Sequence, residues 1–375
     1  MRLLFSAVPA HGHVLPLVPF VRAAAHLGHD VAVMTSVVMQ RPLAVELPGV
    51  TFLAAGPDPM AIGSLVAERF PGADPVNDPQ PETVAEFFAG ARVDLAHDAA
   101  LDAARAWGPD LVVVDAVDFV GPLVAAELDL PYAMVAFGPD VPPEFTQPML
   151  AVVAPRYSAR GLTMQPPVAV LDPAPRSFQT PDWTATPLTL PFRAEAYRRD
   201  DQGVIPSADR DAGATRPTVL VTLGTVFNDA ALLSAILADV AALDVDVVAT
   251  LGVQLTSPPL EAPNVRFEGF RPLAELLPGV DVVVTTGGAG TVLAAAAAGV
   301  PMVVIPQGAD QFINAARAVE AGVAVQESDP AAVGAAVRSL LGNTVVAAAA
   351  RSVQQEISER PSAEQVLEQL LERVR

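Results

Sequence analysis

The chain has 375 residues, 51% of them hydrophobic, which is enough for two domains of ordinary size. It contains neither cysteine nor lysine, and this excludes disulfides, cysteine–metal sites, Schiff-base chemistry and the phosphate loop that needs a lysine. A formal net charge of −20 argues against nucleic acid and anionic membranes as partners.

The N-terminal residues and the positions of the histidines narrow the class of protein further. Residues 1–13 predict a first strand and a turn rather than a signal peptide, and no apolar run reaches membrane-spanning length. We therefore expect a cytoplasmic protein. All five histidines lie at or before His97, which argues against a structural zinc site, and we expect no metal.

Buried strands and amphipathic helices alternate through the first half of the chain. The patterns predict strands at 3–8, 30–34, 50–54, 111–114 and 132–137 and helices at 15–27, 83–107 and 119–128. Residues 57–82, rich in Pro, Gly and Asp, are predicted to form a mobile loop. Prolines recur through 139–191, which we interpret as an irregular segment lining a cleft.

The pattern restarts after a polar stretch at 198–216, which we interpret as an interdomain linker. The sequence then predicts strands at 218–222, 245–251, 265–268, 281–284, 302–305 and 323–325 and helices at 229–243, 291–298 and 330–341. The tail at 363–374 is amphipathic. Strands and helices that alternate in both halves predict an α/β protein of two doubly wound, Rossmann-like domains.

One unit of this pattern, at residues 281–314, carries a binding signal. A strand runs into a turn with Gly287, Gly288 and Gly290, a helix follows, and a second strand leads to a polar loop at 307–311. The glycines allow another group to approach the start of the helix, where free N–H groups and the helix dipole favour an anion. We therefore predict that a nucleotide diphosphate binds there.

Four motifs occur in an order that resembles one family. They are HGHVLPL at 11–17, VTLGT at 221–225, GFRPLAELLP at 269–278 and the 281–314 stretch. Together they resemble the two-domain glycosyltransferases of the natural-product type, which have the GT-B fold and attach sugars to antibiotics and other small aglycones. The resemblance covers nearly the whole chain. It implies two domains that face each other across a cleft.

The resemblance also implies a division of labour between these domains. Residues 1–208 are expected to bind the acceptor and residues 209–355 the nucleotide sugar, while a C-terminal helix at 356–375 packs back on the first domain. The implied reaction is an inverting, metal-independent transfer of a deoxysugar from a nucleoside diphosphate to a hydroxyl of a hydrophobic aglycone. The donor is a substrate, so no further cofactor is expected, and a homodimer is one state that the sequence allows.

Such a reaction needs a base that works near neutral pH. His13 matches the position of the family's base, and imidazole suits the task because its ordinary pKa is about 6.5. Asp115, at the end of a predicted strand, matches the partner carboxylate that would fix the tautomer and stabilise the imidazolium. The structural alternatives are a His13 that satisfies the first turn and an Asp115 that caps a helix. Asp118 is the rival partner, and His11 is interpreted as a structural or acceptor-side neighbour.

The same resemblance assigns donor-binding roles in the second half. The diphosphate is expected on the backbone of Gly287, Gly288, Gly290 and Thr291, with a second contact from Thr225. Phe270 falls at the aromatic position on which the nucleotide base stacks, with core packing as the alternative. Asp310 and Gln311 match a carboxylate–amide pair that accepts hydroxyls of the sugar, with a helix start capped by the aspartate as the alternative.

Two positions depart from the family's pattern. Thr286 stands where a histidine commonly donates to the diphosphate; a hydroxyl still donates one hydrogen bond but carries no charge. Ala294 stands where plant-like members have a glutamate that holds the ribose hydroxyls. Without that glutamate a contact to the 2′-hydroxyl is missing, which favours a thymidine nucleotide, whose sugar lacks this group, over a uridine nucleotide.

Two other functions share these features. A sugar-nucleotide epimerase would bind the same donor without an acceptor, and a non-catalytic helper protein would have lost the chemistry at Thr286. The presence of both His13 and Asp115 argues against the helper. The Asp244-Val245-Asp246 spacing occurs in metal–diphosphate sites elsewhere, but it borders a predicted buried strand here and is interpreted as structural.

Overall fold

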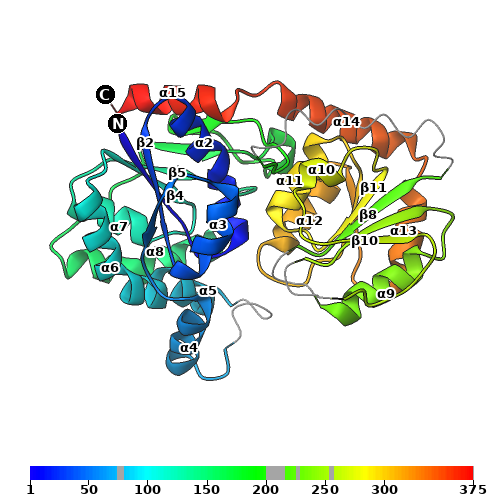
Figure 1. Cartoon of the computed structure of the whole chain (residues 1–375), viewed down its shortest axis with the longest axis horizontal. Coiled ribbons are helices and arrows are strands. Elements are labelled where there is room, and N and C mark those ends of the chain that lie inside the picture. The colour runs from blue at the N-terminus through cyan, green and yellow to red at the C-terminus, as the bar shows by residue number, and fades with distance from the viewer. Residues whose placement is uncertain (74–79, 200–215, 225–228, 253–256, 375) are drawn as a thin grey trace. The chain divides into compact units, whose positions relative to one another are not determined.

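The computed structural model describes residues 1–73, 80–199, 216–224, 229–252 and 257–374. The chain forms two compact units (Figure 1). The first unit contains Met1–Pro173, Thr184–Phe192 and Pro361–Arg375, and the second contains Ala174–Trp183 and Arg193–Arg360. The chain thus passes between the units more than once. Most of the predicted linker, at 200–215, lies outside the described residues.

The first unit is built on a seven-stranded parallel sheet of order β3-β2-β1-β4-β5-β6-β7. Its strands are β1 Arg2–Ser6, β2 Asp30–Thr35, β3 Thr51–Ala54, β4 Leu111–Asp115, β5 Tyr132–Val135, β6 Ala169–Asp172 and β7 Thr189–Pro191. All five residues of β4 are buried, as expected for a parallel strand that is covered on both faces. The order places β1 beside β4 at the centre of the sheet. Up to β3 the strands are added on one side of β1, and from β4 onward they are added on the other side.

The helices of the first unit are α1 His11–Val14, α2 Val18–His26, α3 Gln40–Glu46, α4 Pro59–Arg69, α5 Pro81–Ala85, α6 Arg92–Trp107, α7 Val120–Glu127, α8 Pro143–Ser158 and α15 Ala363–Arg373. Shorter 3₁₀ turns are η1 Leu15–Leu17, η2 Val37–Met39 and η4 Arg176–Phe178, the last belonging to the second unit. The π-helical segment η3 Glu86–Ala91 joins α5 to α6, so the long helix predicted at 83–107 is present with one wider turn.

Two predictions for the first unit are wrong. The predicted loop at 57–82 contains the helix α4, which begins where the Asp58 carboxylate accepts a hydrogen bond of 2.9 Å from the Ala61 amide. The segment 139–191, interpreted as irregular, contains the helix α8 with Pro148 and Pro155 inside it, followed by β6 and β7.

The second unit is built on a six-stranded parallel sheet of order β10-β9-β8-β11-β12-β13. Its strands are β8 Thr218–Thr222, β9 Asp246–Thr250, β10 Val265–Glu268, β11 Val282–Thr285, β12 Met302–Val304 and β13 Ala324–Gln326. Its helices are α9 Ala230–Val240, α10 Leu273–Leu276, α11 Ala289–Ala297, α12 Gln311–Glu320, α13 Val333–Leu340, preceded by the turn η5 Pro330–Ala332, and α14 Thr344–Ser358.

Alternate residues along these strands divide between two core clusters, one for each face of the sheet. Leu220 and Val283 pack with Val292 of α11 and Val353 of α14, whereas the neighbouring Val221 packs with residues of α9 and α13. The sequence predicts α9, α11 and α13 but no helix over Thr344–Ser358. The second unit is therefore a doubly wound α/β domain, as is the first, and this confirms the predicted fold class.

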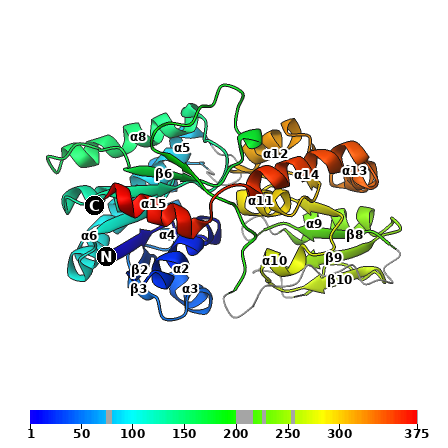
Figure 2. The same cartoon turned by 90° about the horizontal axis from the view of Figure 1, so that it is seen from above.

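The C-terminal helix α15 returns to the first unit and lies beside α2, as Figure 1 and Figure 2 both show. A capping box between Ser362 and Gln365 begins the helix, and its buried face includes Leu367 and Leu370. The His26 Nδ1 atom lies 2.8 Å from a carboxylate oxygen of Glu364.

No single helix in the described part of the chain has the length and apolar composition needed to cross a membrane. One pair, Pro330–Leu340 with Thr344–Ser358, meets that criterion jointly but is bent by 86°. Val337 and Val353 of this pair are buried in the two core clusters of the second unit.

Candidate active site

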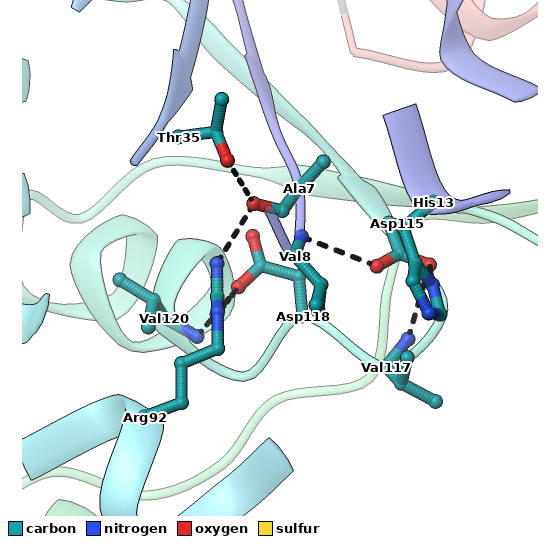
Figure 3. Close-up of polar contacts among 9 residues, drawn as sticks. All are labelled: Ala7, Val8, His13, Thr35, Arg92, Asp115, Val117, Asp118 and Val120. Carbon is teal, nitrogen blue, oxygen red and sulfur yellow. Dashed lines mark hydrogen bonds and ion pairs between the residues drawn. The ribbon is translucent and has the colours of Figure 1, made fainter. Parts of the chain in front are cut away.

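The first centre lies where β1 and β4 end side by side in the first unit. His13 belongs to the short helix α1, whose start is set by an extended Ala10 with φ −145°. The His13 Nδ1 atom lies 3.1 Å from Asp115 Oδ1, at the end of β4 (Figure 3). The His13 side chain is 21% exposed and the Asp115 side chain 2%. The structure therefore brings the two residues predicted as base and partner into direct contact.

Backbone amides hold the Asp115 carboxylate from two sides. The Val8 amide donates to Oδ2 at 3.4 Å, and the Val117 amide donates to Oδ1 at 3.5 Å. Both hydrogen bonds are long, so they orient the carboxylate but offset little of its negative charge. A carboxylate that accepts from Nδ1–H leaves the lone pair of the imidazole on Nε2, which is the tautomer a general base needs.

Asp118, the rival partner, is engaged elsewhere. It forms a buried ion pair with Arg92, and its Oδ1 atom also accepts a hydrogen bond of 3.0 Å from the Val120 amide at the start of α7. This arrangement leaves Asp115 as the carboxylate that contacts His13.

Two aromatic rings pack against the imidazole. Phe88 lies edge-on to His13 with 5.7 Å between ring centroids, and Phe137 lies edge-on at 5.4 Å. Phe88 comes from the π-helical segment η3, a type of turn that often occurs at functional sites. Neither ring is among the predicted site residues, although Phe88 lies in a long predicted helix and Phe137 is the last residue of a predicted strand. The two rings make the surroundings of the His13 imidazole apolar.

His11 lies on the same short helix as His13. Burial lowers the pKa of His11 below its ordinary value, and the negative charge of Glu46 opposes this only in part. The role of His11 as a structural or acceptor-side neighbour stays a prediction.

The second centre is the glycine turn between β11 and α11 in the second unit. Gly287 has φ +96°, and a Cβ atom there would lie 2.7 Å from Val304 Cγ1 and 3.2 Å from the Gln311 carbonyl oxygen, so the position requires glycine. Gly288 is the N-cap of α11, and among the described residues no side chain caps this helix. A Cβ atom at Gly288 or Gly290 would meet no described atom within 4 Å, so the start of the helix has room beside it.

Thr286 is 1% exposed, and its hydroxyl donates a hydrogen bond of 3.2 Å to the Leu223 carbonyl. A hydroxyl has a single proton to donate. The Thr286 hydroxyl, predicted to donate a hydrogen bond to the diphosphate, therefore donates instead to the backbone. This bond joins the end of β11 to the turn after β8. Thr291 lies in the first turn of α11 and is half-buried.

The loop that precedes α12 is held by side chains from the first turn of that helix. The Gln311 Oε1 atom accepts from the amides of Gln307 at 2.7 Å and Gly308 at 3.3 Å, and the residue is 4% exposed. Asn314 donates to the Gly287 carbonyl at 2.9 Å and to Asp310 Oδ2 at 2.7 Å. Sequence reasoning missed Asn314, which stands one helical turn after Asp310 and ties this loop to the glycine turn.

The remaining donor-side residues stay predictions. Phe270 is half-buried just after β10 and is absent from the core clusters of the second unit, whereas Thr225 lies outside the described residues. Ala294 is 2% exposed within a core cluster of the second unit.

The Asp244 and Asp246 carboxylates lie 3.9 Å and 2.6 Å from the Arg216 guanidinium. This arginine balances their charge at the surface, consistent with the structural interpretation. Among the described residues no group of three His, Asp or Glu side chains is placed to hold a metal ion.

Both units together match solved glycosyltransferases over nearly the whole chain. SsfS6 from Streptomyces sp. SF2575, solved with thymidine diphosphate, is 26% identical with a TM-score of 0.83 and coverage of 99% of both chains. The spinosyn rhamnosyltransferase SpnG, solved with the spinosyn aglycone, is 26% identical with a TM-score of 0.81 and coverage of 99% of this chain and all of the other. The protein is thus a glycosyltransferase of the GT-B fold.

The particular family follows from the sequence profiles. The N-terminal domain of the erythromycin biosynthesis protein CIII-like family matches residues 22–224, and its C-terminal domain matches residues 234–373. An L-demethylnoviosyl transferase from Streptomyces niveus is 32% identical over 99% of this chain and 97% of its own length. The chain belongs to this family of natural-product glycosyltransferases, which confirms the resemblance and sets aside the epimerase and the non-catalytic helper.

Proposed function

We propose that this protein transfers a deoxysugar from a thymidine diphosphate donor to a hydroxyl of a hydrophobic natural product, with inversion at the anomeric carbon and without a metal. The observation that carries the proposal is the contact of 3.1 Å between His13 and Asp115 in apolar surroundings. The solved complexes of SsfS6 with thymidine diphosphate and of SpnG with an aglycone support the two substrate classes.

His13 acts as the general base in this proposal. Its Nε2 atom takes the proton of the acceptor hydroxyl as that oxygen attacks the anomeric carbon. A carbon–oxygen bond to the acceptor forms, the bond to the diphosphate breaks, and the electron pair leaves with thymidine diphosphate. Asp115 stabilises the imidazolium that results, and the proton then passes to solvent. A positioned base contributes about 10²–10⁴-fold to the rate.

The leaving diphosphate is stabilised by the start of α11. The backbone amides of Gly288 and Gly290 and the helix dipole offer positive potential where the side of the helix is open. Because the chain has no lysine and the Thr286 hydroxyl binds Leu223, this backbone contribution carries more of the stabilisation than any side chain described in the turn. Asp310 and Gln311 flank the position of the donor sugar, with Gln311 shaping the loop.

The acceptor side accounts for a hydrophobic substrate. Phe88 and Phe137 border the imidazole with apolar rings, so an acceptor that approaches Nε2 meets aromatic surface rather than charged groups. An acceptor hydroxyl on a flat aromatic or polyketide-like skeleton suits these surroundings best.

A reconstituted assay tests the proposal. The enzyme is incubated with a thymidine diphosphate deoxysugar and a panel of aromatic and polyketide alcohols, with a chelator present. We expect product formation, release of thymidine diphosphate, and an anomeric proton coupling in the NMR spectrum that shows inversion. Retention of configuration, dependence on a divalent cation, or a preference for uridine diphosphate donors would contradict the corresponding part of the proposal.

A further inference from the structure

The peptide bond between Ala7 and Val8 joins two hydrogen-bond networks just after β1 (Figure 3). Its carbonyl oxygen accepts from Arg92 Nη2 at 2.8 Å and from the Thr35 hydroxyl at 2.9 Å. Its N–H group, on Val8, donates to Asp115 Oδ2 at 3.4 Å. Because a peptide unit is planar and resists twisting, the groups that hold its carbonyl also fix the direction of its N–H.

The groups that hold this carbonyl are buried and are themselves oriented. Thr35 is 1% exposed and Arg92 is 4% exposed. Asp118 pairs with the other terminal nitrogen of the same guanidinium, so the planar fork of Arg92 is set from both ends. A carbonyl that accepts two hydrogen bonds polarises its peptide and strengthens the opposite N–H as a donor.

The geometry points to Arg92 and Thr35 as positioning residues, which act through the Ala7–Val8 peptide to hold Asp115 against His13. This inference rests on the proposed role of the His13–Asp115 pair in catalysis. Arg92 and Thr35 come from α6 and β2, so the sheet and the helix on its face jointly set the orientation of the carboxylate. Thr35→Val removes one donor to the carbonyl while keeping the shape of the side chain, so it isolates the hydrogen bond from the packing.

The first measurement compares Thr35→Val with Thr35→Ser, using the best acceptor found for the wild-type enzyme. We expect Thr35→Val to lower kcat by about threefold to tenfold, the range of one hydrogen bond, with the KM for the donor unchanged. Thr35→Ser keeps the hydroxyl and should recover most of this loss. Equal rates for Thr35→Val and the wild type, or no recovery in Thr35→Ser, would overturn the inference.

A double-mutant cycle with Asp115→Asn distinguishes action through Asp115 from a general structural effect. If Thr35 acts through the carboxylate, Thr35→Val should cause no further loss in the Asp115→Asn background. The same should hold for Arg92→Lys, which keeps the charge and loses the planar fork. A loss of equal size in both backgrounds would show that these residues only support the fold.

The cycle also separates this inference from the proposed function. If Asp115→Asn alone leaves the rate unchanged, the catalytic role of the dyad fails and the positioning role fails with it. If Asp115→Asn abolishes most of the rate while Thr35→Val and Arg92→Lys match the wild type, only the positioning role fails.

Discussion

In the first unit the candidate chemistry lies on side chains, whereas in the second unit it lies on the backbone. His13 and Asp115 meet through their functional groups, and Phe88 packs on the imidazole. At the glycine turn, by contrast, the side chains of Thr286 and Asn314 use their hydrogen bonds to hold the loops in place. A side-chain site depends on residue identity, and a backbone site depends on conformation. The two regions should therefore respond to mutation in different ways.

The largest effect is expected at the side-chain site. Asp115→Asn keeps the size of the group but removes the charge that stabilises the imidazolium. It also replaces one of two acceptor oxygens with an NH₂ donor, so the selection of the tautomer is disturbed. We expect kcat to fall by about 10²-fold or more, while thermal unfolding still shows stabilisation by thymidine diphosphate. A fall of less than threefold would show that the carboxylate has no part in the base.

Gly287→Ala tests the backbone site through its conformation. The new side chain meets a positive φ and the Val304 methyl group, so we expect a loss of about 1–3 kcal/mol in the free energy of unfolding and little stabilisation by thymidine diphosphate. Gly290→Ala is the matched control, because its Cβ meets open space in a helix and should raise stability by up to about 1 kcal/mol. Because alanine keeps the backbone N–H of this position, Gly290→Ala should still bind thymidine diphosphate, and a strongly raised Kd would mean that the ligand occupies the space of the added methyl group.

Thr286→Val tests whether the Thr286 hydroxyl holds the loop in place or binds the diphosphate. Removal of the hydroxyl leaves the buried Leu223 carbonyl without this donor, so the free energy of unfolding should fall by about 1–3 kcal/mol. The Kd for thymidine diphosphate, measured by calorimetry, should change by less than about threefold. A Kd raised more than about tenfold would assign Thr286 to the diphosphate instead.

A smaller effect is expected from the pH dependence of stability. Since burial lowers the pKa of His11 below 6.5 in the folded state, the unfolded chain takes up this proton at a higher pH than the native protein does. The contribution of His11 is thus complete above about pH 6.5 and is lost as the pH falls below it. His11→Asn should flatten the Tm between about pH 7 and pH 5; an unchanged slope would mean that other groups dominate there.

The sequence predicts strands better than it predicts irregular connections, for physical reasons that particular residues show. Buried parallel strands are continuous apolar runs, so the prediction at 218–222 coincides with β8. The helix α4 is hidden in a stretch rich in proline and glycine, although Asp58 followed by Pro59 is a recognisable helix start.

The candidate site shows a similar division. The contact between His13 and Asp115 could be predicted because His13 follows the first strand and Asp115 ends another. The carboxyl ends of parallel strands lie on the same side of the sheet. The choice of Asp115 over Asp118 was predicted only from the family resemblance. Its physical cause could not be predicted, since it depends on Arg92, which lies 26 residues earlier and pairs with Asp118. The engagement of Thr286 with Leu223 likewise depends on how β8 and β11 pair.

The most direct test of the central claim is the His13→Ala variant, measured for binding and for transfer in the same preparation. We predict that thymidine diphosphate raises its Tm as much as it raises that of the wild type, while the transfer rate falls by at least about 10²-fold. His26→Ala, whose ring is 76% exposed, serves as the control and should transfer normally. Transfer by His13→Ala at the wild-type rate would contradict the assignment of His13 as the base.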